Sequence, residues 1–146
     1  MSLEKWVEYG WLRKEPSSPD EIQGLVSIVE RSLKDARVEA ISDDLRFQAA
    51  FAGALNAANL ALRASGYRTR MQTGHHQKTI ESLELTIQAN PKLIPKLLLF
   101  SKKRNATSYD SAGSISHQDL QQVIKVADEL RKSVMVWIRE HHPELM

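Results

Sequence analysis

The run of small residues between Ser42 and Ser65 constrains the fold of this chain more than any other feature. Ser42 is a natural N-cap, two aspartates follow it in the first turn, and Gly66 is a natural stop, so the segment predicts one long helix. Few side chains in its interior would hold neighbouring helices away: Ala49, Ala50, Ala52, Gly53, Ala54, Ala57, Ala58 and Ala61. We therefore expect this helix to be the close-packed centre of a bundle.

Two asparagines, Asn56 and Asn59, interrupt that run of small residues. A buried amide must find hydrogen-bond partners. These two side chains therefore join a structural network, line a site or face water, and the structural role is the expectation.

Four further helices complete the prediction of an all-α fold, an antiparallel up-and-down bundle of four to five helices. Ser18, Pro19 and Glu21 form a capping box that opens a helix to about Ala36. The others are expected over about 76–88, from Asn90-Pro91 to Gly113, and from Ser116 to about Glu140, with Asp119 completing a second capping box.

The chain has one domain, because 146 residues suffice for a single core. Residues 18–146 form the bundle, and residues 1–17 form an N-terminal arm whose Trp6, Tyr9 and Trp11 are expected to dock on it. A loop over 66–74 is expected to carry Tyr67, Arg68 and Arg70.

Several classes of protein are excluded by composition and motifs. The chain has no cysteine, so it has no disulfide framework. It shows no signal peptide and no apolar run long enough to span a membrane, and a cytoplasmic location is expected. No phosphate-binding loop or dinucleotide fingerprint is present, and no cofactor is predicted. No metal site is predicted either, since His75 and His76 would point about 100° apart on a helix.

Positive charge is concentrated in the middle of the chain. Residues 45–109 contain ten Lys and Arg but two acids, whereas the whole chain has a net charge of +2. The central segment therefore carries +8 and the two flanks together −6. This asymmetry is typical of an anion-binding surface. The alternative is that acidic outer helices pack beside basic inner ones and neutralise them.

The stretch from Lys102 to Tyr109 looks most like a site, because it places three adjacent cations, an amide and a phenol near the end of a helix. Together with Gly66-Tyr67-Arg68, Gly74-His75-His76 and Tyr109-Asp110, it resembles the HEPN domain family, in particular small stand-alone bacterial HEPN proteins. The resemblance covers roughly residues 19–142. It implies a helical bundle that forms a homodimer, often with a nucleotidyltransferase-like partner in toxin–antitoxin systems, and in many members a metal-independent ribonuclease.

Catalytic members of the family carry an arginine followed four to six residues later by a histidine. Arg104-Asn105 matches the first part, but Ser108, Tyr109 and Asp110 occupy the positions where the histidine would stand. Arg104 and Tyr109 are therefore the candidate catalytic residues, in a site that lacks the family histidine. The candidates for RNA or nucleotide binding are Lys102, Lys103, Arg104, Asn105, Arg68, His75 and His76.

Cleavage of RNA without a metal needs a base, an acid and a cation. Arg104 would supply the cation, and His75 or His76 would replace the missing histidine if the fold brought either one near Arg104. A structural role stands beside this hypothesis, in which Arg104 pairs with Asp43 or Asp44.

Two functions remain open from the sequence. The first is a HEPN-type protein of toxin–antitoxin or RNA-associated systems that binds RNA or a nucleotide. The alternative is a non-catalytic, dimeric interaction module whose basic central region meets an acidic partner protein.

Overall fold

The computed structural model describes residues 1–70, 74–109 and 115–146, with only the backbone of 106–109. The chain is mostly helical, as predicted. Its elements are α1 (Leu3–Glu8), β1 (Leu12–Lys14), α2 (Pro19–Ala36), α3 (Asp43–Ala64), β2 (Tyr67–Thr69), α4 (His75–Glu81), η1 (Ser82–Glu84), α5 (Leu93–Tyr109), α6 (His117–His141) and η2 (Pro143–Leu145). In the described part of the chain, no helix has both the length and the apolar character needed to cross a membrane.

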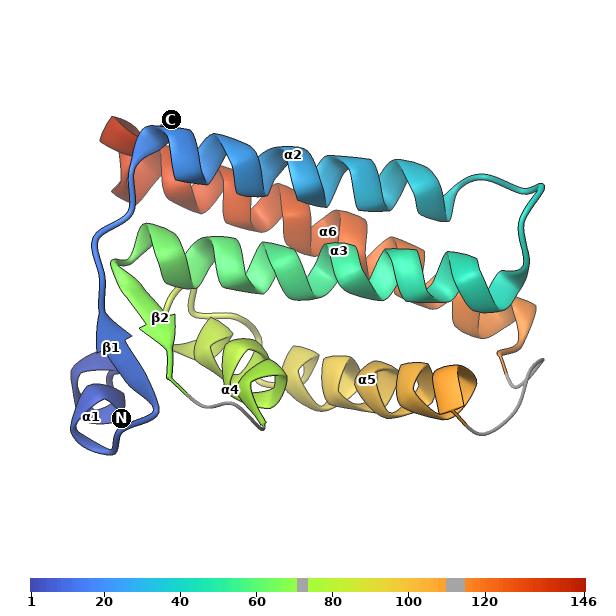
Figure 1. Ribbon diagram of the computed structural model, residues 1–146, viewed down its shortest axis with the longest axis horizontal. Coiled ribbons are helices and arrows are strands. Elements are labelled where there is room, and N and C mark those ends of the chain that lie inside the picture. Colours follow the sequence, from blue (N-terminus) through green and yellow to red (C-terminus); the bar gives the residue numbers. More distant parts are fainter. Residues whose placement is uncertain (71–73, 110–114) are drawn as a thin grey trace.

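The alanine-rich helix α3 lies at the centre of the molecule. Figure 1 shows it between α2 and α6 on one side and α4 and α5 on the other, and α2 and α5 run opposite to α3 and α6. Both aromatic residues of α3, Phe47 and Phe51, are buried, together with most of its small residues. A Cβ atom on Gly53 would lie 2.8 Å from Leu33 Cδ2, so a larger residue at this position would have to displace the Leu33 side chain.

The predicted helix starts are confirmed at two N-caps. The Ser42 hydroxyl accepts a hydrogen bond from the Leu45 amide at 3.2 Å. Ser116 and Asp119 form the reciprocal capping box at the start of α6. Both caps satisfy amide groups that a first helical turn leaves without partners.

The expectation of a wholly helical chain with a loop over 66–74 is wrong in detail. Residues 12–14 and 67–69 form a two-stranded antiparallel sheet, in which Leu12 lies opposite Thr69. Gly66 allows the sharp exit from α3, because its φ of 89° suits only glycine well. The N-terminal arm therefore docks by backbone pairing as well as through Trp6, which is buried with Leu12 and Leu62, whereas Tyr9, also expected to dock, is 52% exposed.

The helix expected over 76–88 is also shorter than predicted. The α-helix α4 ends at Glu81, and the chain tightens into the 3₁₀ turn η1. The amides of both Leu85 and Thr86 donate to the carbonyl of Ser82, so the regular helical ladder stops there. Gln88 then takes a positive φ of 55°, which turns the chain toward α5.

A buried arginine ties the arm to the bundle. Arg63 on α3 is 1% exposed, and its guanidinium donates to both carboxylate oxygens of Glu21, at 2.6 and 2.9 Å. It also donates to the backbone carbonyls of Glu15 and Tyr67, at 2.7 and 3.0 Å. The capping box expected at the start of α2 is therefore only half correct, since the Ser18 hydroxyl accepts from the Glu21 amide but the Glu21 carboxylate binds Arg63.

Gly53→Leu should destabilise the fold, because the new side chain must displace Leu33 from the core. We expect the free energy of unfolding to fall by about 1–3 kcal/mol, as for other overpacked cores. Gly24→Leu on α2 is the matched control, since nothing lies within 4 Å of a Cβ there. It should stabilise by about 0.5–1 kcal/mol through helix propensity. Equal effects in urea unfolding would contradict the close approach of α2 and α3.

Arg63→Met should lower the free energy of unfolding by about 3 kcal/mol. This value is at the low end of the range for breaking a buried ion pair, because the partner Glu21 is partly exposed. Hydrogen bonding by Arg63 is the main cause that lowers the pKa of Glu21. A carboxylate with a lowered pKa stabilises the fold above its unfolded pKa, and this stability is lost as the pH falls through the folded value. Arg63→Met should therefore also flatten the loss of stability between neutral and acid pH.

The control for that experiment is Arg31→Met, which removes an exposed arginine of α2. It should change the free energy of unfolding by less than about 0.5 kcal/mol. A comparable loss in both variants, measured by urea unfolding at each pH, would mean that the buried network does not hold the arm.

Candidate functional site

The three adjacent cations of the Lys102–Arg104 motif point to different surroundings. Successive residues of a helix are rotated by about 100°, so neighbours in sequence cannot share one face. Lys102 is exposed, whereas Lys103 contacts Asp119 at the start of α6 with an Nζ–Oδ1 distance of 2.8 Å. That hydrogen bond is the main cause that lowers the pKa of Asp119. Lys103 is thus engaged in joining α5 to α6.

Arg104 faces the centre of the molecule. Its guanidinium lies over the ring of Phe51 on α3, with 5.6 Å between the Cζ atom and the ring centroid. One terminal nitrogen donates to Asn105 Oδ1 at 2.9 Å, while the Nε atom is buried and has no hydrogen-bond partner. Arg104 forms no ion pair with a carboxylate of the described residues, and Asp43, one of its two expected partners, contacts Arg46 at 3.6 Å.

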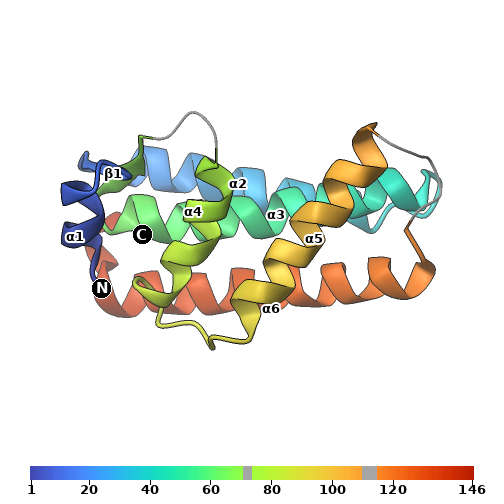
Figure 2. The ribbon, with the colours of Figure 1, turned by 90° about the horizontal axis from the view of Figure 1, so that it is seen from below.

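The fold brings His76 into the electrostatic range of Arg104. Figure 2 shows α4 and α5 diverging from their connection on one side of α3, so that the start of α4 and the end of α5 lie at the same edge. The pKa of His76 is lowered, chiefly by burial, then by the neighbouring His75, and then by the positive charge of Arg104. The imidazole is therefore neutral at pH 7 and able to accept a proton.

A pocket of about 250 Å³ adjoins His76 and joins residues that are far apart in sequence. It is lined by Leu55, Asn56 and Asn59 of α3, Arg68 and Thr69 of β2, and His75, His76 and Thr79 of α4. The expectation of a structural role for the asparagines is therefore incomplete, since both line this pocket. Their i, i+3 spacing was the sequence signal that they share a face of the helix.

Arg68 reaches the pocket with its charge largely neutralised. Its guanidinium forms ion pairs with Glu15 and Glu21, the same carboxylates that bind Arg63. Together with Lys103 and Asp119, these pairs match the alternative in which acidic flanks neutralise the basic centre. Among the predicted binding residues whose side chains are described, Arg104 is the inward-facing cation that forms no ion pair with a described carboxylate.

Some predicted site residues fall outside this description. Tyr109 ends α5, but its side chain lies outside the described part of the structure. Asp110 and Gly113, the expected helix stop, lie wholly outside the described residues. Asn105 is exposed and contacts Arg104.

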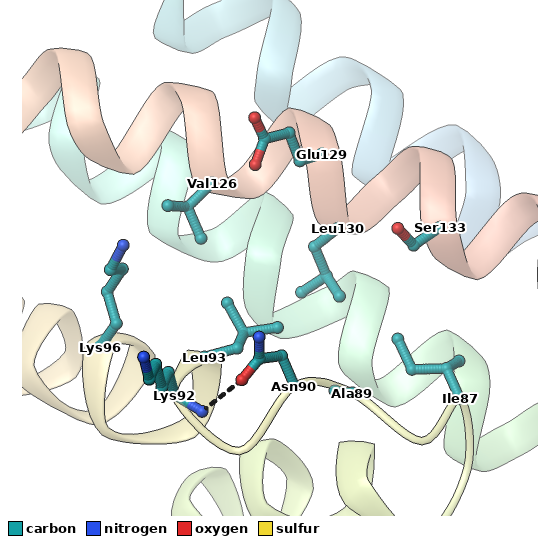
Figure 3. Close-up of a pocket in the computed structure, with 10 residues that line it drawn as sticks. All are labelled: Ile87, Ala89, Asn90, Lys92, Leu93, Lys96, Val126, Glu129, Leu130 and Ser133. Atoms are coloured by element: carbon teal, nitrogen blue, oxygen red, sulfur yellow. Dashed lines mark hydrogen bonds between the residues drawn. The ribbon is translucent and has the colours of Figure 1, made fainter.

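A larger cavity, of about 440 Å³, lies between the start of α5 and the middle of α6. Figure 3 shows its mainly apolar floor, with Leu93 and Leu130 facing each other. Asn90 accepts from the Lys92 amide at 2.9 Å, so its carboxamide oxygen already serves the start of α5. No predicted site residue lines this cavity. Nowhere in the described ranges do three His, Asp or Glu side chains gather as a metal site would require.

The pKa of His76, measured by NMR titration, should lie below its ordinary value of 6.5. Arg104→Ala should raise it, because removing the guanidinium removes one of the charges that disfavour the imidazolium. Arg139→Ala, which removes an exposed cation of α6, should leave it unchanged. A His76 titration that is the same in both variants would show that Arg104 and His76 do not interact.

Comparison with known proteins assigns neither a family nor a function to the chain. No protein-family model matches the chain, and neither a curated protein nor a solved structure shows significant similarity to it.

Proposed function

We propose that this chain is a HEPN-type protein that binds RNA or nucleotide phosphates on the face formed by α3, α4 and α5. The observation that carries the proposal is the electrostatic effect of Arg104, which forms no ion pair with a carboxylate of the described residues, on His76 at the edge of a polar pocket. The resemblance of the sequence motifs to the HEPN family supports the same class of ligand.

Arg104 is suited to phosphate because a guanidinium presents several donors in a fixed plane. The ring of Phe51 packs against the Arg104 guanidinium and restricts its side chain, so less conformational entropy is lost when a phosphate binds. A carboxylate partner would have to be displaced first, and none of the described carboxylates occupies this position. These features favour an anion as the ligand of Arg104.

His76 supplies what the family histidine would supply. A neutral imidazole accepts a proton from a 2′-hydroxyl, and a nearby guanidinium stabilises the charge that then develops on the phosphate. The pair thus offers a base and a cation on two different helices, in place of one histidine following Arg104. Metal-independent cleavage of RNA is compatible with this arrangement, and binding is the function proposed.

The wider setting follows from the resemblance. We propose a homodimer, paired with a nucleotidyltransferase-like antitoxin, as in toxin–antitoxin systems of the family. The alternative, a module for an acidic protein partner, needs an extended basic surface. The ion pairs of Arg63, Arg68 and Lys103 reduce that surface, which favours a compact site centred on Arg104.

Arg104→Ala should weaken binding of a short single-stranded RNA by about tenfold or more, the cost of one charge-assisted contact. The slope of log affinity against log salt should become shallower by about 0.7, because one phosphate contact fewer releases fewer counterions. Fluorescence anisotropy with a labelled uridine decamer, over a range of salt concentrations, measures both quantities.

Arg139→Ala is the matched control, because it removes the same charge from the exposed surface of α6. It should leave the affinity within about twofold, since non-specific charge effects at this distance are screened. Equal weakening by both variants would indicate general electrostatic attraction and would refute a site at Arg104. Incubation of the same RNA with EDTA present tests cleavage in parallel.

A further inference from the structure

The pocket beside His76 has features of a base-recognition site. From its lining we infer that it takes up one unstacked base with an exocyclic amine, such as adenine, from a single-stranded RNA, while Arg104 holds a phosphate of the same strand. This inference rests on the proposed function and names the class of base that the site selects.

The two asparagines of α3 provide the hydrogen-bonding groups. Asn56 Nδ2 donates to the Ala52 carbonyl at 2.8 Å, which leaves its Oδ1 as an acceptor toward the pocket. The carboxamide of Asn59 has no hydrogen bond to the described residues, so it offers one acceptor and one donor group. Both side chains are half-buried and line the pocket.

Two other polar groups of the lining are already engaged. The Thr79 hydroxyl donates to the His75 carbonyl at 2.8 Å, and Arg68 is held by Glu15 and Glu21. The groups that α3 offers to a ligand come from the two carboxamides, with two acceptor oxygens and the remaining amide hydrogens, and Thr69 and the two histidines add further polar groups to the lining.

Adenine complements this pattern, whereas uracil does not. The exocyclic amine of adenine has two hydrogens, one for each asparagine oxygen, and a ring nitrogen beside the amine accepts from Asn59 Nδ2. The pairing of an asparagine carboxamide with the amine and ring nitrogen of adenine is a common form of direct recognition. Cytosine and guanine also carry an exocyclic amine beside a ring nitrogen, and uracil carries none.

The shape of the pocket suits a flat ring. Its volume of about 250 Å³ far exceeds the roughly 30 Å³ share of one water molecule. The imidazoles of His75 and His76, whose centroids are 4.0 Å apart, form one wall, and Leu55 adds an apolar surface. Proteins that read single-stranded RNA combine aromatic walls of this kind with hydrogen bonds to base edges.

The test compares two labelled decamers, one of uridine alone and one with a single central adenosine, by fluorescence anisotropy at one salt concentration. The wild-type protein should bind the adenosine-containing RNA at least about fivefold more tightly, the low end for one bidentate base contact. Asn59→Ala should abolish this preference, because binding of the adenosine-containing RNA should fall to the level of the uridine decamer. Alanine is a good helix former, so the variant should keep α3 intact.

Gln48→Ala is the matched control, since it removes an amide from α3 about three turns away from the pocket. It should retain the preference. Arg104→Ala should weaken both RNAs by the same factor, which separates phosphate binding from base selection. Equal binding of the two RNAs by the wild-type protein, or a preference that survives in Asn59→Ala, would overturn the adenine site and leave the proposed function standing. Binding of neither RNA would refute both.

Discussion

The burial of α3 on nearly all sides is the constraint on which the rest of the structure depends. A helix packed between α2, α4, α5 and α6 presents small side chains where its neighbours approach, as at Gly53, where a Cβ atom would lie 2.8 Å from Leu33 Cδ2. Large residues appear only where space exists between neighbours, as for Phe47 and Phe51. Asn56 and Asn59 lie on the side of α3 that faces α4 and β2, where they line the pocket.

The burial of the Arg63 charge is a second constraint on the structure. A guanidinium with 1% exposure must have its donors paired, and the partners come from the start of α2, from the arm and from β2. The N-terminal segment is therefore part of the fold and not an appendage. The same carboxylates also form ion pairs with Arg68. Arg63 and Arg68 are therefore engaged within the fold, whereas Arg104 binds none of the described carboxylates.

The candidate site shows how spatial proximity can replace a linear motif. In the family that the sequence resembles, arginine and histidine lie on one helical segment. Here the positions after Arg104 contain no histidine, and the histidine on which the charge of Arg104 acts is His76 of α4. Burial of His76 keeps its imidazole neutral.

The sequence by itself determined the helical class, the central role of the Ala-rich segment and the caps at Ser42 and Ser116, because these follow from local patterns of spacing and side-chain chemistry. It also indicated the cations of 102–104 and the histidines of 75–76. Only the tertiary structure decided that Lys103 binds Asp119, that Glu21 leaves its cap for Arg63, and that the charge of Arg104 acts on His76. These outcomes depend on partners that are distant in sequence, and no local pattern encodes which partner a charge will meet.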